Sequence, residues 1–98
     1  MALTNIKFPL GRTVMTSGVN DKVAEDSKFA EFVTKSLARH ATGDWGDMSQ
    51  EDKAENDLVL KAGNLRIFSA YEKPELPKIW IITEADRSAT TILFPDEY

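Results

Sequence analysis

The chain has 98 residues, 42% of them hydrophobic, which predicts one small soluble domain with a single core over residues 1–98. It has no cysteine, which excludes disulfides, thiolate metal sites and cysteine nucleophiles and favours the reducing cytoplasm. Its net charge of −4 disfavours nucleic acid as a partner, and no long apolar run indicates secretion or membrane insertion.

The first part of the chain lacks a sustained hydrophobic period. Residues 1–12 contain Pro9 and Gly11, so we expect a partly ordered arm whose order depends on docking against the fold. The β-branched and apolar stretch at residues 13–16 fits a short strand at the edge of a sheet, bounded by Ser17 and Gly18.

An amphipathic helix is predicted over residues 27–41. Asp26 or Ser27 can cap its first turn, and Gly43 can adopt the left-handed conformation that ends it. The apolar residues recur every three or four positions, which places them on one side of the helix: Phe29, Phe32, Val33 and Leu37.

A second helix is predicted over residues 50–62. Ser49 and Asp52 approximate a capping box at its start, and Gly63 supplies its stop. Because its apolar stripe is narrow, we expect this helix on the surface of the fold.

Three strands are predicted in the last third of the chain, over residues 65–71, 78–83 and 89–94. The middle strand is apolar on both faces, so we expect Trp80 and Ile82 or Ile81 to be the most buried residues of the sheet. Short loops between consecutive strands favour an antiparallel meander. The predicted fold is therefore α+β, with two helices, a three-stranded antiparallel meander and an N-terminal edge strand.

Four residues are catalytic candidates. His40, the only histidine, can act as a general base, or it can be a helix-end residue that offsets the helix dipole. Arg66, Tyr71 and Arg87 lie on or beside the predicted strands, with Glu84 and Asp86, and such sets position a phosphodiester in small ribonucleases. The alternative is that these are solvated strand and turn residues with local partners.

The string from Gly43 to Asp47 combines two glycines, two carboxylates and a tryptophan. Asp44, Trp45 and Asp47 are therefore the candidate binding residues, with a turn that packs Trp45 beneath it as the alternative. Gly43 lets the chain turn back, so we expect Trp45 close to His40. The spacing departs from that of an EF-hand, and we predict neither a metal site nor a cofactor.

Three strings together resemble a family of short uncharacterised bacterial proteins that are often called plasmid-related: residues 38–47, 66–71 and 80–98. Some members carry a label that connects them to type I restriction systems. The resemblance covers about residues 10–98 and implies neither an established activity nor assigned catalytic residues. The order of predicted elements is also similar to that of RelE and ParE type toxins.

Three functional hypotheses follow. The leading one is a non-enzymatic accessory or interaction protein of a bacterial mobile element, which presents the loop around Trp45 and the acidic helix that follows it to a protein partner. The alternatives are a small RelE/ParE-like ribonuclease or toxin-type enzyme, and an acidic mimic of nucleic acid. The ribonuclease hypothesis requires His40 and Arg66 to share one cleft. The sequence leaves the oligomeric state open.

Overall fold

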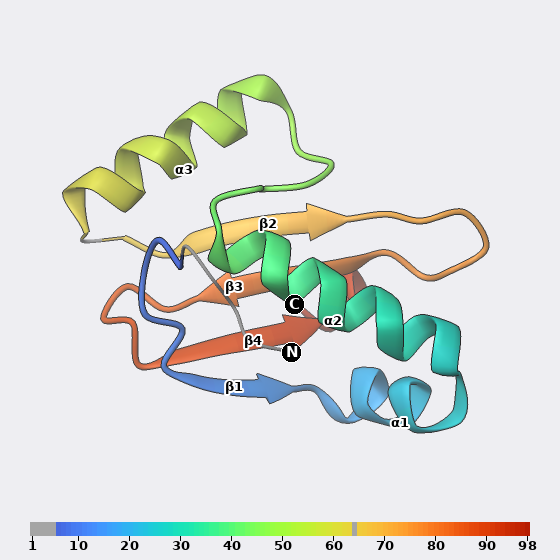
Figure 1. The fold of residues 1–98 in the computed structure, drawn as a ribbon. Coiled ribbons are helices and arrows are strands. Elements are labelled where there is room, and N and C mark those ends of the chain that lie inside the picture. Colours follow the sequence, from blue (N-terminus) through green and yellow to red (C-terminus); the bar gives the residue numbers. More distant parts are fainter. Residues whose placement is uncertain (1–5, 64) are drawn as a thin grey trace.

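A computed structural model describes residues 6–63 and 65–98, and it has the α+β class that the sequence predicts. Its elements in chain order are β1 (Arg12–Met15), α1 (Ser17–Glu25), α2 (Ser27–Ala41), α3 (Gln50–Ala62), β2 (Ile67–Tyr71), β3 (Ile79–Thr83), β4 (Ala89–Leu93) and the 3₁₀ turn η1 (Pro95–Glu97). Figure 1 shows the sheet with α1 and α2 on one face and α3 alongside β2.

The sheet has four strands in the order β1-β4-β3-β2. Strands β2, β3 and β4 pair antiparallel in sequence order, as the short loops predict. The predicted edge strand also exists, one residue earlier than expected, and it pairs parallel with β4. The sheet is therefore mixed and four-stranded, so a three-stranded meander describes only part of it.

Helix α1 has no counterpart among the predicted elements. Val19 is its only buried residue, so it has almost no apolar period to detect. Thr16 caps it by accepting the backbone N–H of Val19. A Cβ on Gly18 would lie 2.6 Å from a carboxylate oxygen of Glu97, so this glycine makes room for a side chain and does not mark a break in the structure.

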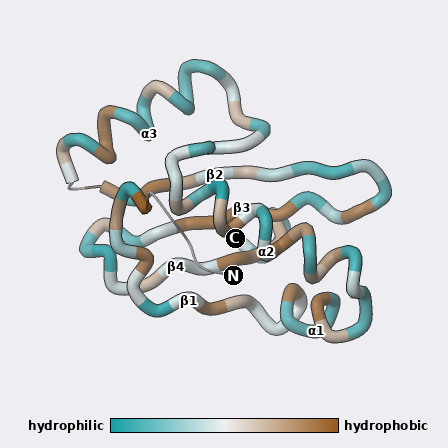
Figure 2. The backbone as a smooth tube through the Cα atoms, viewed as in Figure 1, coloured by the Kyte–Doolittle hydropathy of each residue, from teal (hydrophilic) through white to brown (hydrophobic). Residues whose placement is uncertain are grey.

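The two predicted helices have the predicted ends. The Asp26 carboxylate accepts the backbone N–H groups of Lys28 and Phe29 at the start of α2. Ser49 caps α3 by accepting from the N–H of Asp52, and Gly63 closes α3 with a φ of 74°. Helix α2 packs its apolar side against the sheet, as expected, in a core of Val19, Phe29, Phe32, Val33, Tyr71, Ile79, Ile81 and Ile92, with Leu37 partly buried beside it. Figure 2 shows hydrophobic positions along α2 and along the strands against which it packs.

The prediction for Trp80 was wrong. Ile79 and Ile81 are fully buried and Ile82 is 4% exposed, whereas Trp80 is only half-buried. Side chains alternate between the two faces of a strand, so Trp80 projects to the face opposite α1 and α2. There it packs edge-on against Phe68 and Tyr98, at ring distances of 4.8 and 5.6 Å.

Part of the N-terminal arm docks on the fold, whereas residues 1–5 lie outside the described residues. Phe8 is buried, and the backbone N–H of Lys7 donates to the carbonyl of Ala41 at the end of α2. Within residues 6–63 and 65–98, no helix combines the length and the apolar character needed to cross a membrane.

Candidate functional site

His40 is fully buried between α2 and the sheet, where both of its ring nitrogens have partners. Nδ1 lies 2.5 Å from the hydroxyl of Ser69 on β2, and Nε2 lies 2.9 Å from that of Thr83 on β3. Phe8 and Trp45 pack edge-on against the imidazole at ring distances of 5.3 and 5.9 Å, which confirms the expected proximity of Trp45. Burial lowers the pKa of His40 from 6.5 to about 3, so the ring is neutral near pH 7.

The hydrogen bonds around His40 form a chain with one direction. The hydroxyl of Thr90 lies 2.6 Å from the carbonyl of Leu10 and must donate to it, because a carbonyl only accepts. Thr90 therefore accepts from Thr83 at 2.7 Å, and Thr83 accepts from Nε2 of His40. The proton of the neutral imidazole is thus on Nε2, which leaves Nδ1 to accept from Ser69.

The four catalytic candidates do not gather in one place. Tyr71 is fully buried beside α2, its hydroxyl donates to the carbonyl of Asp44, and burial raises its pKa. Arg87 lies in the turn between β3 and β4, where it donates to the carbonyls of Leu65, Glu84 and Ala85. Arg66 is exposed and is a lining residue of a pocket to which His40 does not contribute.

The loop from Gly43 to Asp47 has structural partners for each candidate binding residue. Asp44 accepts two hydrogen bonds from Arg39, which holds the pKa of this carboxyl below its usual value. Asp47 accepts the backbone N–H of Glu72. Trp45 is 3% exposed and its indole N–H donates to Asp57, so the turn with Trp45 packed beneath it describes this loop.

Helix α3 and the loop before it cover the outer edge of β2. The side-chain amide of Asn56 donates to the carbonyl of Phe68 and accepts from its N–H, as a neighbouring strand would do. Next along the edge, the N–H of Ala70 donates to the carbonyl of Trp45, and the carbonyl of Ala70 accepts from the N–H of Asp47. These bonds satisfy backbone groups that an open sheet edge leaves exposed.

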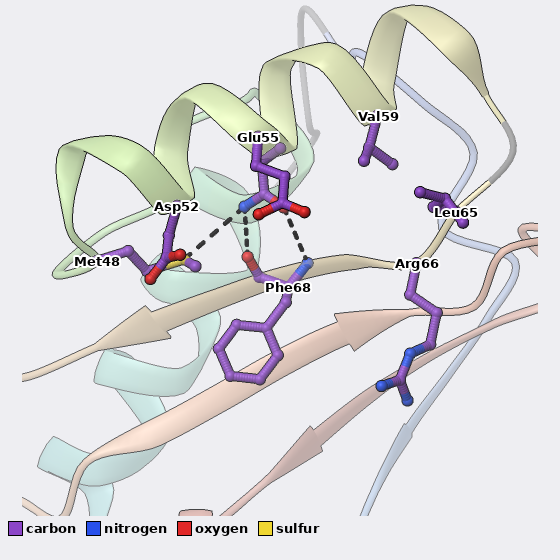
Figure 3. Close-up of a pocket in the computed structure, with 8 residues that line it drawn as sticks. Met48, Asp52, Glu55, Val59, Leu65, Arg66 and Phe68 are labelled. Carbon is purple, nitrogen blue, oxygen red and sulfur yellow. Dashed lines mark hydrogen bonds between the residues drawn. The ribbon is translucent and has the colours of Figure 1, made fainter.

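A groove lies between α3 and β2, and we call it the α3–β2 groove. Its volume is about 290 Å³, and it is lined by Met48, Asp52, Glu55, Asn56, Val59, Leu65, Arg66 and Phe68. Figure 3 shows Asp52 and Glu55 extending from α3 toward β2, with Phe68 below them. A second hollow of about 240 Å³ shares three of these residues and adds Leu58 and Ala62.

The groove combines apolar walls with unbalanced negative charge. Leu58 and Leu65 are 69% and 55% exposed, and both line the second hollow, so they belong to one apolar surface. Asp52 and Glu55 are exposed, and neither has an ion-pair partner within 4.0 Å among residues 6–63 and 65–98. This arrangement suits contact with a cationic and partly apolar surface.

Comparison with protein-family models, with curated proteins and with solved structures found no match. The chemistry of the site therefore rests on the residues above. In the described part of the chain, no three histidine or acidic side chains are placed to hold a metal ion together.

Sequence reasoning missed the partners of His40 and the role of Asn56. One signal was available: Ser69 lies between Ile67 and Tyr71 at the spacing that puts all three on one face of a strand. A polar residue on such a face, and a histidine on the apolar face of a helix, each need a buried partner.

Proposed function

We propose that this chain is a non-enzymatic protein-interaction module, and that the outer side of α3 with the α3–β2 groove is its contact surface. The observation that carries the proposal is the exposure of Leu58 and Leu65 beside the carboxylates of Asp52 and Glu55. Exposed apolar patches with polar rims are typical of protein contact sites. The negative rim favours a partner with a basic surface, since opposite fields speed encounter and disfavour wrong partners.

The ribonuclease alternative receives little support from the geometry. General acid–base chemistry needs a side chain within hydrogen-bond reach of the substrate, and His40 is fully buried with both ring nitrogens occupied. His40 also does not line the pocket that Arg66 lines, so the two residues share no cleft there.

The nucleic-acid mimic alternative accounts for only part of the surface. A mimic presents spaced negative charges in place of phosphates, and Asp52 and Glu55 fit that role. The exposed side chains of Leu58 and Leu65 have no counterpart in a phosphate backbone. A mixed apolar and acidic contact favours a protein partner with its own apolar anchors.

Site-specific photo-crosslinking tests the proposal. A photoreactive amino acid at Leu58 should crosslink a basic protein, whereas the same group at Ala24, exposed on α1, should not. The purified partner should bind the wild-type chain, and its affinity should fall with Leu58→Ser and with added salt. Identical crosslinks from both positions would contradict the proposed surface, and RNA cleavage that Arg66→Ala abolishes would favour the enzyme.

The resemblance to plasmid-related proteins extends the proposal to a mobile element. If the chain is an accessory of such an element, its gene should lie among transfer or partition genes. A neighbouring antitoxin-like gene would instead favour the toxin-type enzyme.

A further inference from the structure

We propose that the α3–β2 groove receives one arginine side chain from the protein partner. This inference rests on the proposed interaction function and names the chemistry of its central contact. The groove's volume of about 290 Å³ lies at the lower end of the range for small-molecule sites, about 300–1,000 Å³. It is therefore suited to one long side chain and too small for a large cofactor.

The walls of the groove match the stem of such a side chain. Met48, Val59, Leu65 and Phe68 line it with aliphatic and aromatic carbon. Long basic side chains commonly bury their methylene groups along apolar surface while the charged head meets polar groups. The ring of Phe68 adds a face on which a planar guanidinium can stack.

The acidic residues of the groove supply the charge for the head group. Asp52 and Glu55 are three positions apart on α3, and Glu51 is four positions before Glu55, so like charges are neighbours on this helix. Such pairs destabilise a helix by a small amount. The two lysines of α3 offset this little, because the helical period places Lys61 opposite Asp52 and Lys53 nearly opposite Glu55.

Arg66 is the one basic residue that lines the groove, but its guanidinium is held elsewhere. It donates to the hydroxyl of Tyr98 and lies 5.6 Å from the centre of that ring. Figure 3 shows Arg66 extending away from α3, so the chain's own arginine does not occupy the space beside Asp52 and Glu55.

The second hollow indicates that the cation comes from a protein segment. It adjoins the groove through Glu55, Val59 and Leu65, and it extends along α3 past Leu58 and Ala62. A free cation bound in the groove would leave this second hollow unfilled. A protein segment that offers an apolar residue near its arginine can fill both hollows at once.

A titration with N-acetyl-arginine methylamide, followed by amide NMR spectra of the full chain, tests the inference. We expect saturable shifts at Phe68 and at the side-chain amide of Asn56, which joins α3 to β2. Asp52→Asn with Glu55→Gln should weaken binding by about tenfold or more, because each removes a charged partner. The single changes Glu55→Gln and Glu51→Gln form a matched pair, since both remove one charge from α3 and only Glu55 lines the groove.

Three results would overturn the inference. They are no saturable shift with the arginine probe, equal binding of the uncharged N-acetyl-norleucine methylamide, and equal losses for Glu51→Gln and Glu55→Gln. Crosslinking at Leu58 reports on the interaction function independently. If the crosslink persists while the arginine probe fails, the module has a partner but the groove does not bind arginine; if both fail, the proposed surface is also wrong.

Discussion

The buried imidazole of His40 links the stability of the fold to pH. Its pKa is about 3 in the folded chain, against 6.5 for an unperturbed histidine. Below about pH 6.5 the unfolded chain binds a proton that the folded chain does not, so folding stability is full above that pH and is lost as pH falls. Once the unfolded histidine is mostly protonated, the loss approaches about 1.4 kcal/mol per pH unit.

We therefore expect the free energy of unfolding in urea to decrease between about pH 6.5 and pH 5. Carboxyls with a lowered pKa, such as those of Asp26 and Asp44, change the stability only at lower pH, because the usual pKa of an aspartate is 3.8. His40→Gln should remove this dependence, and NMR of the wild-type imidazole should show the neutral ring protonated on Nε2 at pH 5. An imidazole that gains a proton near pH 6 would contradict the buried chain of hydrogen bonds.

Gly46 and Gly63 differ in why the position needs a glycine: both have a left-handed backbone, but only Gly46 also lacks space for a side chain. Both have positive φ, 76° and 74°. A Cβ on Gly46 would lie 2.1 Å from the carbonyl of Ala70, whereas a Cβ on Gly63 would meet nothing within 4 Å. We expect Gly63→Ala to cost about 1 kcal/mol of unfolding free energy and Gly46→Ala about 3 kcal/mol or more, measured in urea. Equal costs would show that backbone conformation alone decides both positions.

The proximity of His40 and Trp45 could be predicted from the sequence, but the hydrogen-bond partners of His40 could not. His40 follows Leu37 by three positions and Val33 by seven, so the helical period places it on the apolar side of α2, and Gly43 lets the chain bring Trp45 back toward it. Ser69 and Thr83 follow 29 and 43 positions later, and no local pattern predicts contacts at such separations. Whether Trp80 faces the core also depends on which face of the sheet the helices cover. The sequence of β3 alone does not determine that.

At the scale of elements, α3 depends on a few contacts for its place beside β2. Asn56 bonds the backbone of Phe68, the indole of Trp45 bonds Asp57, and Val59 packs in a small cluster with Phe8, Trp45 and Ile67. The ends of α3 could be predicted because caps are local. Its position could not, because it is set by an asparagine side chain that takes the place of a strand.

Removing the Asn56 amide should loosen α3 from the sheet. Asn56→Ala leaves the carbonyl of Phe68 without its donor, which we expect to cost about 1–3 kcal/mol. Hydrogen exchange at Phe68 should accelerate, along with exchange across α3. The control is Asn20→Ala on the exposed side of α1, which should change neither. Unchanged exchange in Asn56→Ala would mean that Val59 and Trp45 hold α3 unaided.

At the scale of the whole molecule, the first and last elements of the described chain meet. Strand β1 pairs with β4, and the carboxylate of Glu97 accepts from the hydroxyl of Thr16 and from the N–H of Phe94, both at 2.7 Å. Short loops predicted the neighbours of β2, β3 and β4. No loop length could predict the neighbour of β1, because three helices and two strands separate it from β4 in the sequence.

Glu97→Ala should therefore weaken the closure between the two ends. It removes the acceptor of two hydrogen bonds, and we expect a loss of about 1 kcal/mol or more in the free energy of unfolding. Asp96→Ala removes the same charge from an exposed neighbour and should change stability little. The comparison fails to support this closure if the two variants unfold at the same urea concentration.

The directed hydrogen bonds from Ser69 to Leu10 also discriminate between alternative alignments of the sheet. Side chains on a strand alternate between faces, so sliding β3 by two residues against its neighbours would keep Ile79 and Ile81 on the core face. The slide would carry Thr83 away from Thr90 and His40. Each buried polar group left without a hydrogen-bond partner would cost about 1–3 kcal/mol. This series of hydrogen bonds therefore helps to specify the register of the sheet, because it penalises alignments that hydrophobic burial alone would tolerate.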